Sequence, residues 1–148
     1  MSIIRLTKEF TFEMAHILEG YDGPCKNVHG HSYRLLVTVI GAPNLAKEHP
    51  KYGMVMDFGQ LKTIVKTKVI DRFDHVLLIK SDSELLKQCN ILSLGKIEPV
   101  DYQPTCENLL THIAQIISNE LPQEVKLHNL KLHETGTSYA EWYASDNE

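Results

Sequence analysis

Three histidines, His16, His29 and His31, have the spacing of a metal site, and we call them the histidine trio. His29 and His31 belong to a segment with alternating apolar residues, so their side chains face the same side, roughly 6.6 Å apart along a strand. His16 ends an earlier alternating segment, and antiparallel pairing of the two segments would place it beside the other two. Three neutral imidazoles suit Zn²⁺ and leave a fourth position open for water or substrate. The spacing therefore predicts a catalytic zinc site; the alternative is a set of hydrogen-bonded strand histidines.

Cys25 lies in an irregular segment, residues 17–28, that is too long for a tight hairpin. A nearby dication and the Lys26 ammonium would favour the thiolate, the form of cysteine that acts as a nucleophile or general base. Alternatively, Cys25 is a fourth zinc ligand, which would close the site. Cys106 lies in the first turn of an expected helix and Cys89 in a stretch with no assigned element, and we expect both to be structural or incidental.

Three acidic residues near the ends of expected elements are further candidates. Asp74 precedes His75 just after an expected helix, and a histidine oriented by a carboxylate is a common proton shuttle; an ordinary Asp-His at a helix end is an equal alternative. Glu134 ends an expected strand before a turn, which suits a carboxylate at a buried edge. Glu107 lies in the first turn of an expected helix, where the helix dipole alone would explain it. The remaining histidines are expected to be surface or packing residues: His49, His112, His128 and His133.

The strands that must position these residues follow from alternating apolar residues. The pattern predicts four strand-like runs: Ile4 to His16, about His29 to Ile40, Val125 to Glu134, and Ser138 to Ala144. Within the third run, the apolar parity slips between Leu127 and Leu130, which indicates a β-bulge.

Two helices follow from apolar residues at helical spacing. Asp57 is the expected N-cap of the first, with Gln60 three residues later as in a capping box. Its apolar stripe consists of Phe58, Leu61, Ile64, Val65 and Val69. The second begins after Pro104, with Thr105 as its N-cap. Its inner face consists of Leu109, Leu110, Ile113 and Ile117.

The element order predicted for residues 1–148, taken as one domain, is β-β-α-α-β-β. Residues 80–103 have no assigned element apart from a short helix expected from Ser83 to Gln88. Two helices packed on one face of an antiparallel sheet satisfy this order, which places the chain in the α+β class.

The composition is typical of a globular protein, with 148 residues of which 43% are hydrophobic and 23% charged. The net charge of −4 and the lack of a Lys/Arg cluster argue against a nucleic-acid partner. No apolar stretch approaches the length of a signal peptide or a membrane span. The three cysteines form no disulfide-scaffold pattern. We therefore expect a cytoplasmic protein with reduced thiols and no membrane partner.

Six short segments together form a specific pattern. In chain order they are Phe10 to His16, Cys25 to His31, Gly53 to Phe58, Asp74-His75, Pro104 to Asn108, and His133 to Thr135. The set resembles the superfamily of 6-pyruvoyltetrahydropterin synthases and 6-carboxytetrahydropterin synthases, from about Phe10 to Tyr143. The resemblance implies the tunnelling fold, in which ββααββ subunits associate so that their sheets close a barrel. It also implies a homotrimer or a homohexamer with active sites between subunits.

The resemblance further implies roles for individual residues. The histidine trio would bind Zn²⁺, and Cys25, Asp74 and His75 would transfer protons. Glu134 would anchor the pterin ring, because a carboxylate accepts bidentately from the flat donor pair that the 2-amino and N3–H groups form. The residues lining the pterin pocket would be Thr105 and Glu107.

The small-molecule substrate implied by the resemblance is 7,8-dihydroneopterin triphosphate. Three residues separate Cys25 from His29, a spacer that resembles the carboxy-type enzymes of queuosine biosynthesis, whereas pyruvoyl-type enzymes typically have a longer one. The products would then be 6-carboxy-5,6,7,8-tetrahydropterin, acetaldehyde and triphosphate. Two alternatives stay open: a 6-pyruvoyltetrahydropterin synthase acting on the same substrate, and a non-catalytic zinc-stabilised pterin-binding protein.

The sequence departs from the family pattern at a few places. Met14 stands where a small residue is usual, and residues 42–52 and 80–103 are longer than the family minimum. The second extension immediately precedes the expected pterin pocket, so it bears on substrate preference more than on zinc binding. The candidate cations for the triphosphate tail are Lys8, Lys26 and Arg34.

Overall fold

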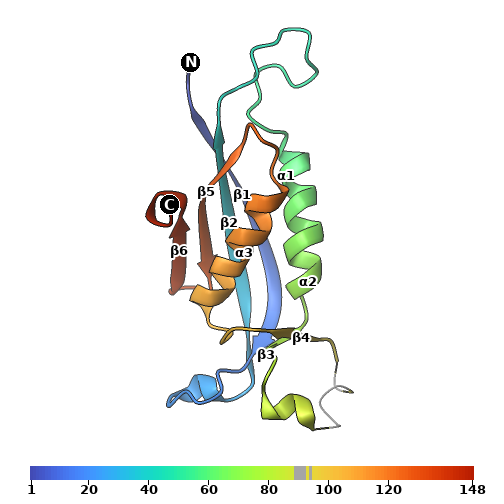
Figure 1. Cartoon of the computed structure of the whole chain (residues 1–148), viewed down its shortest axis with the longest axis vertical. Helices are drawn as coiled ribbons and strands as arrows, with labels where there is room; N and C mark the ends of the chain where they lie inside the picture. The colour runs from blue at the N-terminus through green and yellow to red at the C-terminus, as the bar shows by residue number, and fades with distance from the viewer. Residues whose placement is uncertain (89–92, 94) are drawn as a thin grey trace.

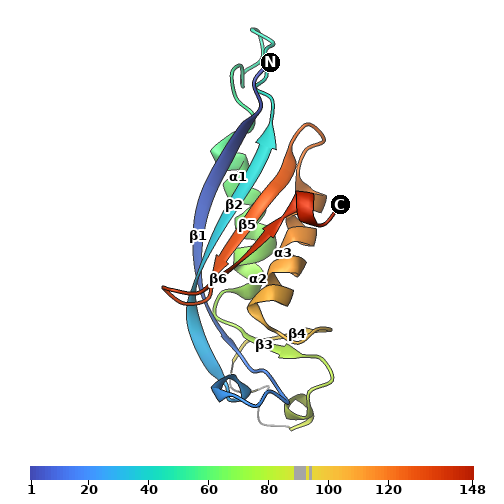
Figure 2. The ribbon, with the colours of Figure 1, turned by 90° about the vertical axis from the view of Figure 1, so that its left-hand side faces the viewer.

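The computed structural model of the chain describes residues 1–88, 93 and 95–148. Six strands form one sheet in the order β4-β3-β1-β2-β5-β6. The helices α1 and α3 lie against one face of this sheet, which curves along its length (Figures 1 and 2). Cys89, which we expected to be structural or incidental, lies outside the described residues.

The central strands, β1 (Ile4–His16) and β2 (His29–Gly41), form a long antiparallel pair. Successive side chains of a strand point to opposite faces, and accordingly Phe12 is buried whereas Glu13 is exposed. The register places His16 directly opposite His29. The antiparallel pairing predicted for these two segments is therefore confirmed.

The strands β5 (Lys126–His133) and β6 (Tyr139–Tyr143) extend the sheet beyond β2, and both pairings are antiparallel. The register between β2 and β5 shifts at Thr38 and Val39, which leaves His128 as the extra residue. The predicted β-bulge is thus confirmed. Such a bulge bends the strand and increases its local twist.

Two short strands that the sequence patterns missed lie on the other side of β1. β3 (Leu77–Lys80) pairs in parallel with both β1 and β4 (Ile97–Val100). The expected antiparallel sheet with the order ββααββ is therefore wrong, since the sheet is mixed and two strands separate the main helices in the chain. Leu78 and Ile79 are adjacent and both buried, so β3 lacks alternation. β4 contains Pro99, a residue that counts against a strand except at a sheet edge.

The first helical run consists of α1 (Phe58–Val65), a π-helical segment (Lys66–Ile70) and the short α2 (Asp71–Phe73). Asp57 caps it as predicted, because its side chain accepts a hydrogen bond from Gly59 N at 2.6 Å. The buried residues of this run are Leu61, Val65, Val69 and Phe73.

Phe58 was expected in the apolar stripe of α1, and this expectation is wrong. Its side chain is 50% exposed. The first turn of the helix lies near the end of the sheet, where Phe58 borders a cavity with Ile4 and Leu6 instead of packing in the core.

The second main helix is α3 (Cys106–Glu120). Thr105 caps it as predicted, since its hydroxyl accepts a hydrogen bond from Asn108 N at 3.2 Å. Its predicted inner face is buried: Leu109, Leu110, Ile113 and Ile117. Where a short helix was expected from Ser83 to Gln88, the chain forms a 3-10 turn (Glu84–Lys87).

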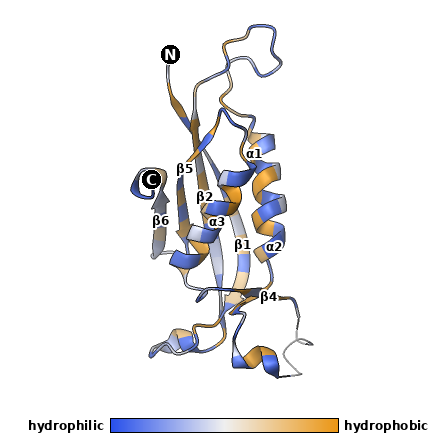
Figure 3. Ribbon diagram, viewed as in Figure 1, coloured by the Kyte–Doolittle hydropathy of each residue, from blue (hydrophilic) through white to orange (hydrophobic). Residues whose placement is uncertain are grey.

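The hydrophobic core consists of buried residues from the helices and from the strands, and Figure 3 shows apolar residues along both. The predicted α+β class, with both main helices on one face, is confirmed (Figure 2). Within the described part of the chain, no helix combines the length and the apolar character needed to cross a membrane.

Candidate functional site

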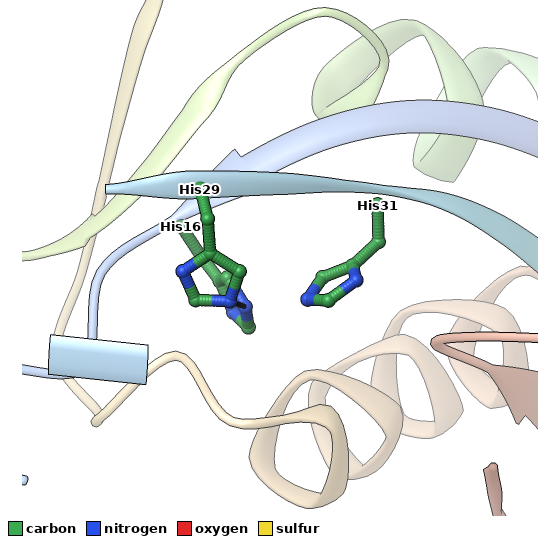
Figure 4. A group of neighbouring side chains, drawn as sticks. All are labelled: His16, His29 and His31. Carbon is green, nitrogen blue, oxygen red and sulfur yellow. Dashed lines mark hydrogen bonds between the residues drawn. The ribbon is translucent and has the colours of Figure 1, made fainter. Parts of the chain in front are cut away.

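The histidine trio converges at one end of the sheet (Figure 4). His16 ends β1 beside His29, which begins β2, and His31 follows on the same strand. All three side chains project toward the side where α3 lies. Each ring offers a nitrogen, and these nitrogens lie within 4.8 Å of one another. The structure therefore brings together the three residues that the sequence grouped.

Main-chain carbonyl groups fix the orientation of two rings in the trio. His16 Nδ1 lies 2.7 Å from Pro104 O, and His29 Nδ1 lies 2.7 Å from Asn27 O. A carbonyl oxygen accepts a hydrogen bond, so Nδ1 is the protonated nitrogen of each ring and Nε2 carries the lone pair in the neutral form. The two Nε2 atoms face each other at 2.9 Å. Two lone pairs at this distance repel unless a cation lies between them.

His31 completes an arrangement that fits a metal ion. Its Nε2 atom is buried without a hydrogen-bond partner, and the nearest carboxylate oxygen, Glu134 Oε1, is 3.8 Å away. Burial lowers the pKa of His31, although Glu134 opposes the shift. Burial also lowers the pKa of His16, so both rings are biased toward the neutral form that a metal requires. Tetrahedral zinc holds its nitrogen ligands roughly 3.3 Å apart, within the range that the trio spans.

A cavity of 550 Å³ lies beside the trio and collects four of the predicted site residues. They are Cys25, Thr105, Glu107 and Glu134. These residues come from the loop after β1, the start of α3 and the end of β5, which are far apart in the sequence. The volume is typical of a site for one small molecule. We call this space the thiol cavity.

Cys25 reaches the thiol cavity from a short 3-10 turn (Pro24–Lys26) in the loop between β1 and β2. The residue is half-buried, and its carbonyl oxygen accepts a hydrogen bond from Leu18 N at 3.0 Å. This bond closes the loop at its base. Cys25 therefore presents a free thiol to the cavity from a loop that carries no other regular element.

Cys106 also lines the thiol cavity, a placement that the sequence patterns did not indicate. Burial, together with the nearby Glu134 and Glu107 carboxylates, raises the pKa of the Cys106 thiol to about 12. Its Sγ donates weakly to Leu132 O at 3.6 Å. Cys106 thus stays a neutral thiol near pH 7, which suits a wall of the cavity and not a nucleophile.

Asp74 and His75 form an oriented pair, which is the geometry that a proton shuttle needs. His75 Nδ1 lies 3.0 Å from Asp74 Oδ1. Glu13 holds both residues: its N–H donates to Asp74 Oδ1 at 2.9 Å, and its carbonyl accepts from His75 N at 2.6 Å. His75 has a φ of 60°, a strained conformation that is often found at functional positions. Burial raises the pKa of Asp74, but the hydrogen bonds from Glu13 N–H and His75 outweigh it and the net pKa is lowered.

Within one chain, the Asp74–His75 pair is not brought to the thiol cavity. His75 lines a second cavity of 700 Å³ together with Glu13, Ser32, Lys96 and His31 of the trio. Glu13 and Ser32 belong to the face of the sheet opposite the buried one, since they alternate with buried positions in β1 and β2. The proton-transfer set expected from the resemblance is therefore divided between two cavities in one chain.

The described residues around the thiol cavity include no Lys or Arg. Of the three candidate cations, Arg34 is engaged elsewhere: its Nε lies 3.2 Å from Glu9 Oε1, and its Nη2 lies 3.1 Å from His133 Nε2. Lys8 lies over the Phe10 ring. None of the candidates is thus placed at the cavity by this chain alone.

Several cavity residues had no signal in the sequence patterns. They include Leu18, Glu19, Tyr21, Gln103 and Tyr139. The first three lie in the irregular loop and Gln103 ends the unassigned 80–103 stretch, where periodicity gives no information. The one sequence feature that pointed to the loop residues and to Gln103 was their closeness in the sequence to Cys25 and to Thr105.

The family comparison covers nearly the whole chain. The family described as 6-pyruvoyl tetrahydropterin synthase matches residues 5–145. A Haemophilus influenzae protein named 6-carboxy-5,6,7,8-tetrahydropterin synthase is 36% identical, with 95% of this chain and 99% of that protein aligned. A Rickettsia felis protein of the same name is 32% identical, with 94% and 99% aligned. The chain therefore belongs to the 6-pyruvoyl tetrahydropterin synthase family, and it is an enzyme of that family.

Solved structures show the same fold. The Caenorhabditis elegans 6-pyruvoyl tetrahydropterin synthase superposes with a TM-score of 0.71 at 24% identity, covering 97% of both chains. An uncharacterized protein from Wolinella succinogenes superposes with a TM-score of 0.79 at 20% identity, covering 97% of this chain and 99% of that one. The curved mixed sheet backed by helices is thus the fold of this family. In this chain, the sheet includes the two short strands that lie between the helices in the sequence.

Proposed function

We propose that this enzyme converts 7,8-dihydroneopterin triphosphate into 6-carboxy-5,6,7,8-tetrahydropterin, acetaldehyde and triphosphate. The observation that carries the proposal is that a thiol and a carboxylate line one cavity, and that this carboxylate adjoins the histidine trio. Cys25 and Glu134 line that cavity, and Glu134 lies within 3.8 Å of His31. The names of the Haemophilus and Rickettsia relatives and the short spacer between Cys25 and His29 support the carboxy-type product.

In this proposal the pterin ring lies in the thiol cavity and donates its 2-amino and N3–H hydrogens to the Glu134 carboxylate. Glu134 is placed for this role by the turn after β5, where its N–H donates to Ser138 O at 3.1 Å. Thr105 and Glu107 border the same space from the first turn of α3. The ring thereby brings its side chain toward the trio, since Glu134 and His31 are neighbours.

We propose Zn²⁺ as the ion held by the histidine trio, because three neutral imidazoles suit zinc and leave a position open for substrate. The chemistry supplied there is Lewis-acid polarisation of the hydroxyl groups on the substrate side chain, which acidifies the adjacent C–H and O–H groups. The carbonyl oxygens of Pro104 and Asn27 support this role, since they keep the lone pairs of His16 and His29 aimed at the shared position.

Cys25 is the proposed proton carrier on the cavity side. Its thiol is half-buried and lines the space that would hold the substrate, whereas Cys106 stays protonated. His75, oriented by Asp74, is the proposed second carrier. Because His75 faces a different cavity in one chain, we propose that each site combines Cys25 of one copy with Asp74 and His75 of a neighbouring copy, in a homotrimer or a homohexamer.

Mixed assemblies test this division of the site. His75→Ala and Cys25→Ala chains, each inactive alone, are unfolded together and refolded as a one-to-one mixture. Random assembly should give about a quarter of the wild-type activity, because half of the sites draw an intact thiol and half of those an intact His75. Refolding each variant by itself is the control. If the mixture is no more active than the separately refolded variants, a single copy supplies both groups.

The reaction itself is tested by incubating zinc-loaded protein with 7,8-dihydroneopterin triphosphate and identifying the products by mass spectrometry. 6-carboxy-5,6,7,8-tetrahydropterin with acetaldehyde is the expected result. 6-pyruvoyltetrahydropterin would keep the site and change the product class. Binding of the pterin without turnover, together with loss of zinc in Cys25→Ala, would instead support a zinc-stabilised binding protein with Cys25 as the fourth ligand.

A further inference from the structure

Glu19 is held at both its side chain and its main chain by residues far away in the sequence. Its Oε1 atom accepts a hydrogen bond from Ser83 Oγ, and its carbonyl oxygen accepts one from Gln103 Nε2 at 2.9 Å. Ser83 is 1% exposed, and its Oγ also accepts from Leu85 N at 3.1 Å. We call Ser83, Glu19 and Gln103 the Glu19 clasp.

The clasp adjoins the loop that carries the thiol. Leu18, the residue before Glu19, donates its N–H to Cys25 O at 3.0 Å. Leu18, Glu19 and Cys25 line the same thiol cavity. Apart from the three-residue turn at Pro24–Lys26, the loop has no helix or strand of its own. Its position therefore depends on a few bonds at its base, and the clasp supplies two of them.

The other end of the clasp is fixed to the sheet. Ser81 N donates to Val100 O at 2.7 Å, and Ser83 N donates to Lys80 O at 3.0 Å. Lys80 and Val100 are the last residues of β3 and β4. Figures 1 and 2 show the loop after β1 and the turn after β3 at the same end of the molecule. The segment after β3 thus connects the thiol loop to a rigid edge of the sheet.

We propose that Glu19 is a positioning residue that fixes Cys25 in the thiol cavity through the clasp. The proposal rests on the proposed function in that Cys25 is taken to be the proton carrier. A hydroxyl donating to a carboxylate forms a strong, directional hydrogen bond, and a misplacement of about 1 Å at a reacting group costs up to roughly 100-fold in rate. The proposal also gives a role to part of the extended 80–103 stretch.

The test uses full-length, zinc-loaded protein and measures Cys25 directly. Iodoacetamide labels the protein under pseudo-first-order conditions, and peptide mass spectrometry follows Cys25, with Cys106 as a second thiol in the same cavity. The disruptive variants are Glu19→Ala, Glu19→Asp and Ser83→Ala. Glu19→Gln keeps both the length and the acceptor oxygen and serves as the conservative rescue. Glu84→Ala is the matched control, because Glu84 is an exposed neighbour of Ser83 that pairs with Lys87.

In the disruptive variants, Cys25 should label about fivefold faster, because a released loop exposes its thiol more often. The value of kcat should fall about tenfold while KM changes by less than about threefold, since the thiol moves and the pterin anchor does not. Glu84→Ala should match the wild type in both measurements, and Glu19→Gln should restore the wild-type labelling rate of Cys25. The double variant Glu19→Ala/Ser83→Ala should label Cys25 no faster than Glu19→Ala alone, because both changes break the same bond between Ser83 and Glu19.

The proposal is overturned if Cys25 labelling in Glu19→Asp and Glu19→Ala stays within about twofold of the wild type. A lower melting temperature without that change would show a role in stability only. Glu19→Asp removes one methylene group and keeps the charge, so it tests the contact even if larger changes impair folding. Labelling needs no pterin: faster labelling in a protein whose wild type has no turnover would support the clasp and refute the proposed function.

Discussion

The Nε2 atoms of His16 and His29 lie 2.9 Å apart, and a main-chain carbonyl oxygen holds Nδ1 of each ring. Both carbonyls, from Pro104 and Asn27, belong to segments without helix or strand. The two strands therefore bring the rings together, while irregular backbone orients them. Outer contacts of this kind fix the tautomer and typically change metal affinity by about 10- to 100-fold when they are lost.

The histidine trio predicts the consequence of removing one ring. His31→Ala should weaken zinc binding by more than about 100-fold, because two neutral ligands do not hold the ion as three do. Zinc content after dialysis against a chelator measures the loss, and the melting temperature should no longer rise when zinc is added. His128→Ala, at the bulge of β5, is the control. Equal zinc retention in His31→Ala and the wild type would contradict the three-histidine site.

The stability of the zinc-free protein should fall as the pH drops below 6.5. Burial lowers the pKa of His16, His31 and His112 from the ordinary value of 6.5. Below pH 6.5 the unfolded chain binds protons that the folded chain does not. The contribution of these histidines to the free energy of unfolding is therefore fully present above pH 6.5 and is lost as the pH falls through the lowered folded-state pKa values. Urea unfolding at intervals from pH 7.5 to 5 measures this. A constant free energy across the range would refute the shifts.

A polar network around His112 of α3 makes a separate prediction. Tyr102 OH lies 2.7 Å from His112 Nδ1, and Arg72 Nη1 lies 3.4 Å from His112 Nε2. Tyr102→Phe leaves the half-buried His112 Nδ1 without its partner and should lower the free energy of unfolding by about 1–2 kcal/mol. Tyr52→Phe, at a 51% exposed tyrosine, should leave it unchanged. Similar unfolding curves for the two variants would show that the bond contributes nothing.

The two thiols of the cavity should differ sharply in function. Cys25→Ala should lower kcat by at least about 100-fold, the usual contribution of one acid–base group, and zinc content should be unchanged. Cys106→Ala should keep turnover within about fivefold, because the raised pKa of Cys106 keeps its thiol protonated. Steady-state kinetics and metal analysis on both variants decide the matter. Unchanged turnover in Cys25→Ala would remove Cys25 from the mechanism.

The long strands were predictable because one face is buried and the other is not. Alternation located β1 and β2, and through them the trio, since His16 and His29 share the parity of the buried residues Phe12 and Tyr33. The β-bulge was predictable for the same reason, because the alternation of apolar residues along β5 shifts by one position. Helix caps at Asp57 and Thr105 followed from local chemistry alone.

The missed features lack such periodicity. Leu78 and Ile79 are both buried, so β3 gives no alternating signal, and parallel pairing depends on residues distant in the sequence. The placement of Cys25 and His75 in two different cavities arises from the three-dimensional path of the chain, since both residues adjoin the same strand pair. Glu19 falls in the irregular loop, and its contact with Ser83 joins two segments that neither propensity nor spacing relates.

The pterin anchor gives the most direct test of substrate recognition. Glu134→Gln replaces one acceptor oxygen by an N–H₂ group, which turns a bidentate acceptor into a mismatched partner for the pterin donors. A lost charge-assisted hydrogen bond costs about 1.5–3 kcal/mol, so pterin affinity should fall by roughly 10- to 150-fold. Equilibrium binding of a pterin to the zinc-loaded protein measures this. Glu141→Gln, at an exposed position of β6 outside the cavity lining, is the matched control. Undiminished affinity in Glu134→Gln would place the pterin elsewhere.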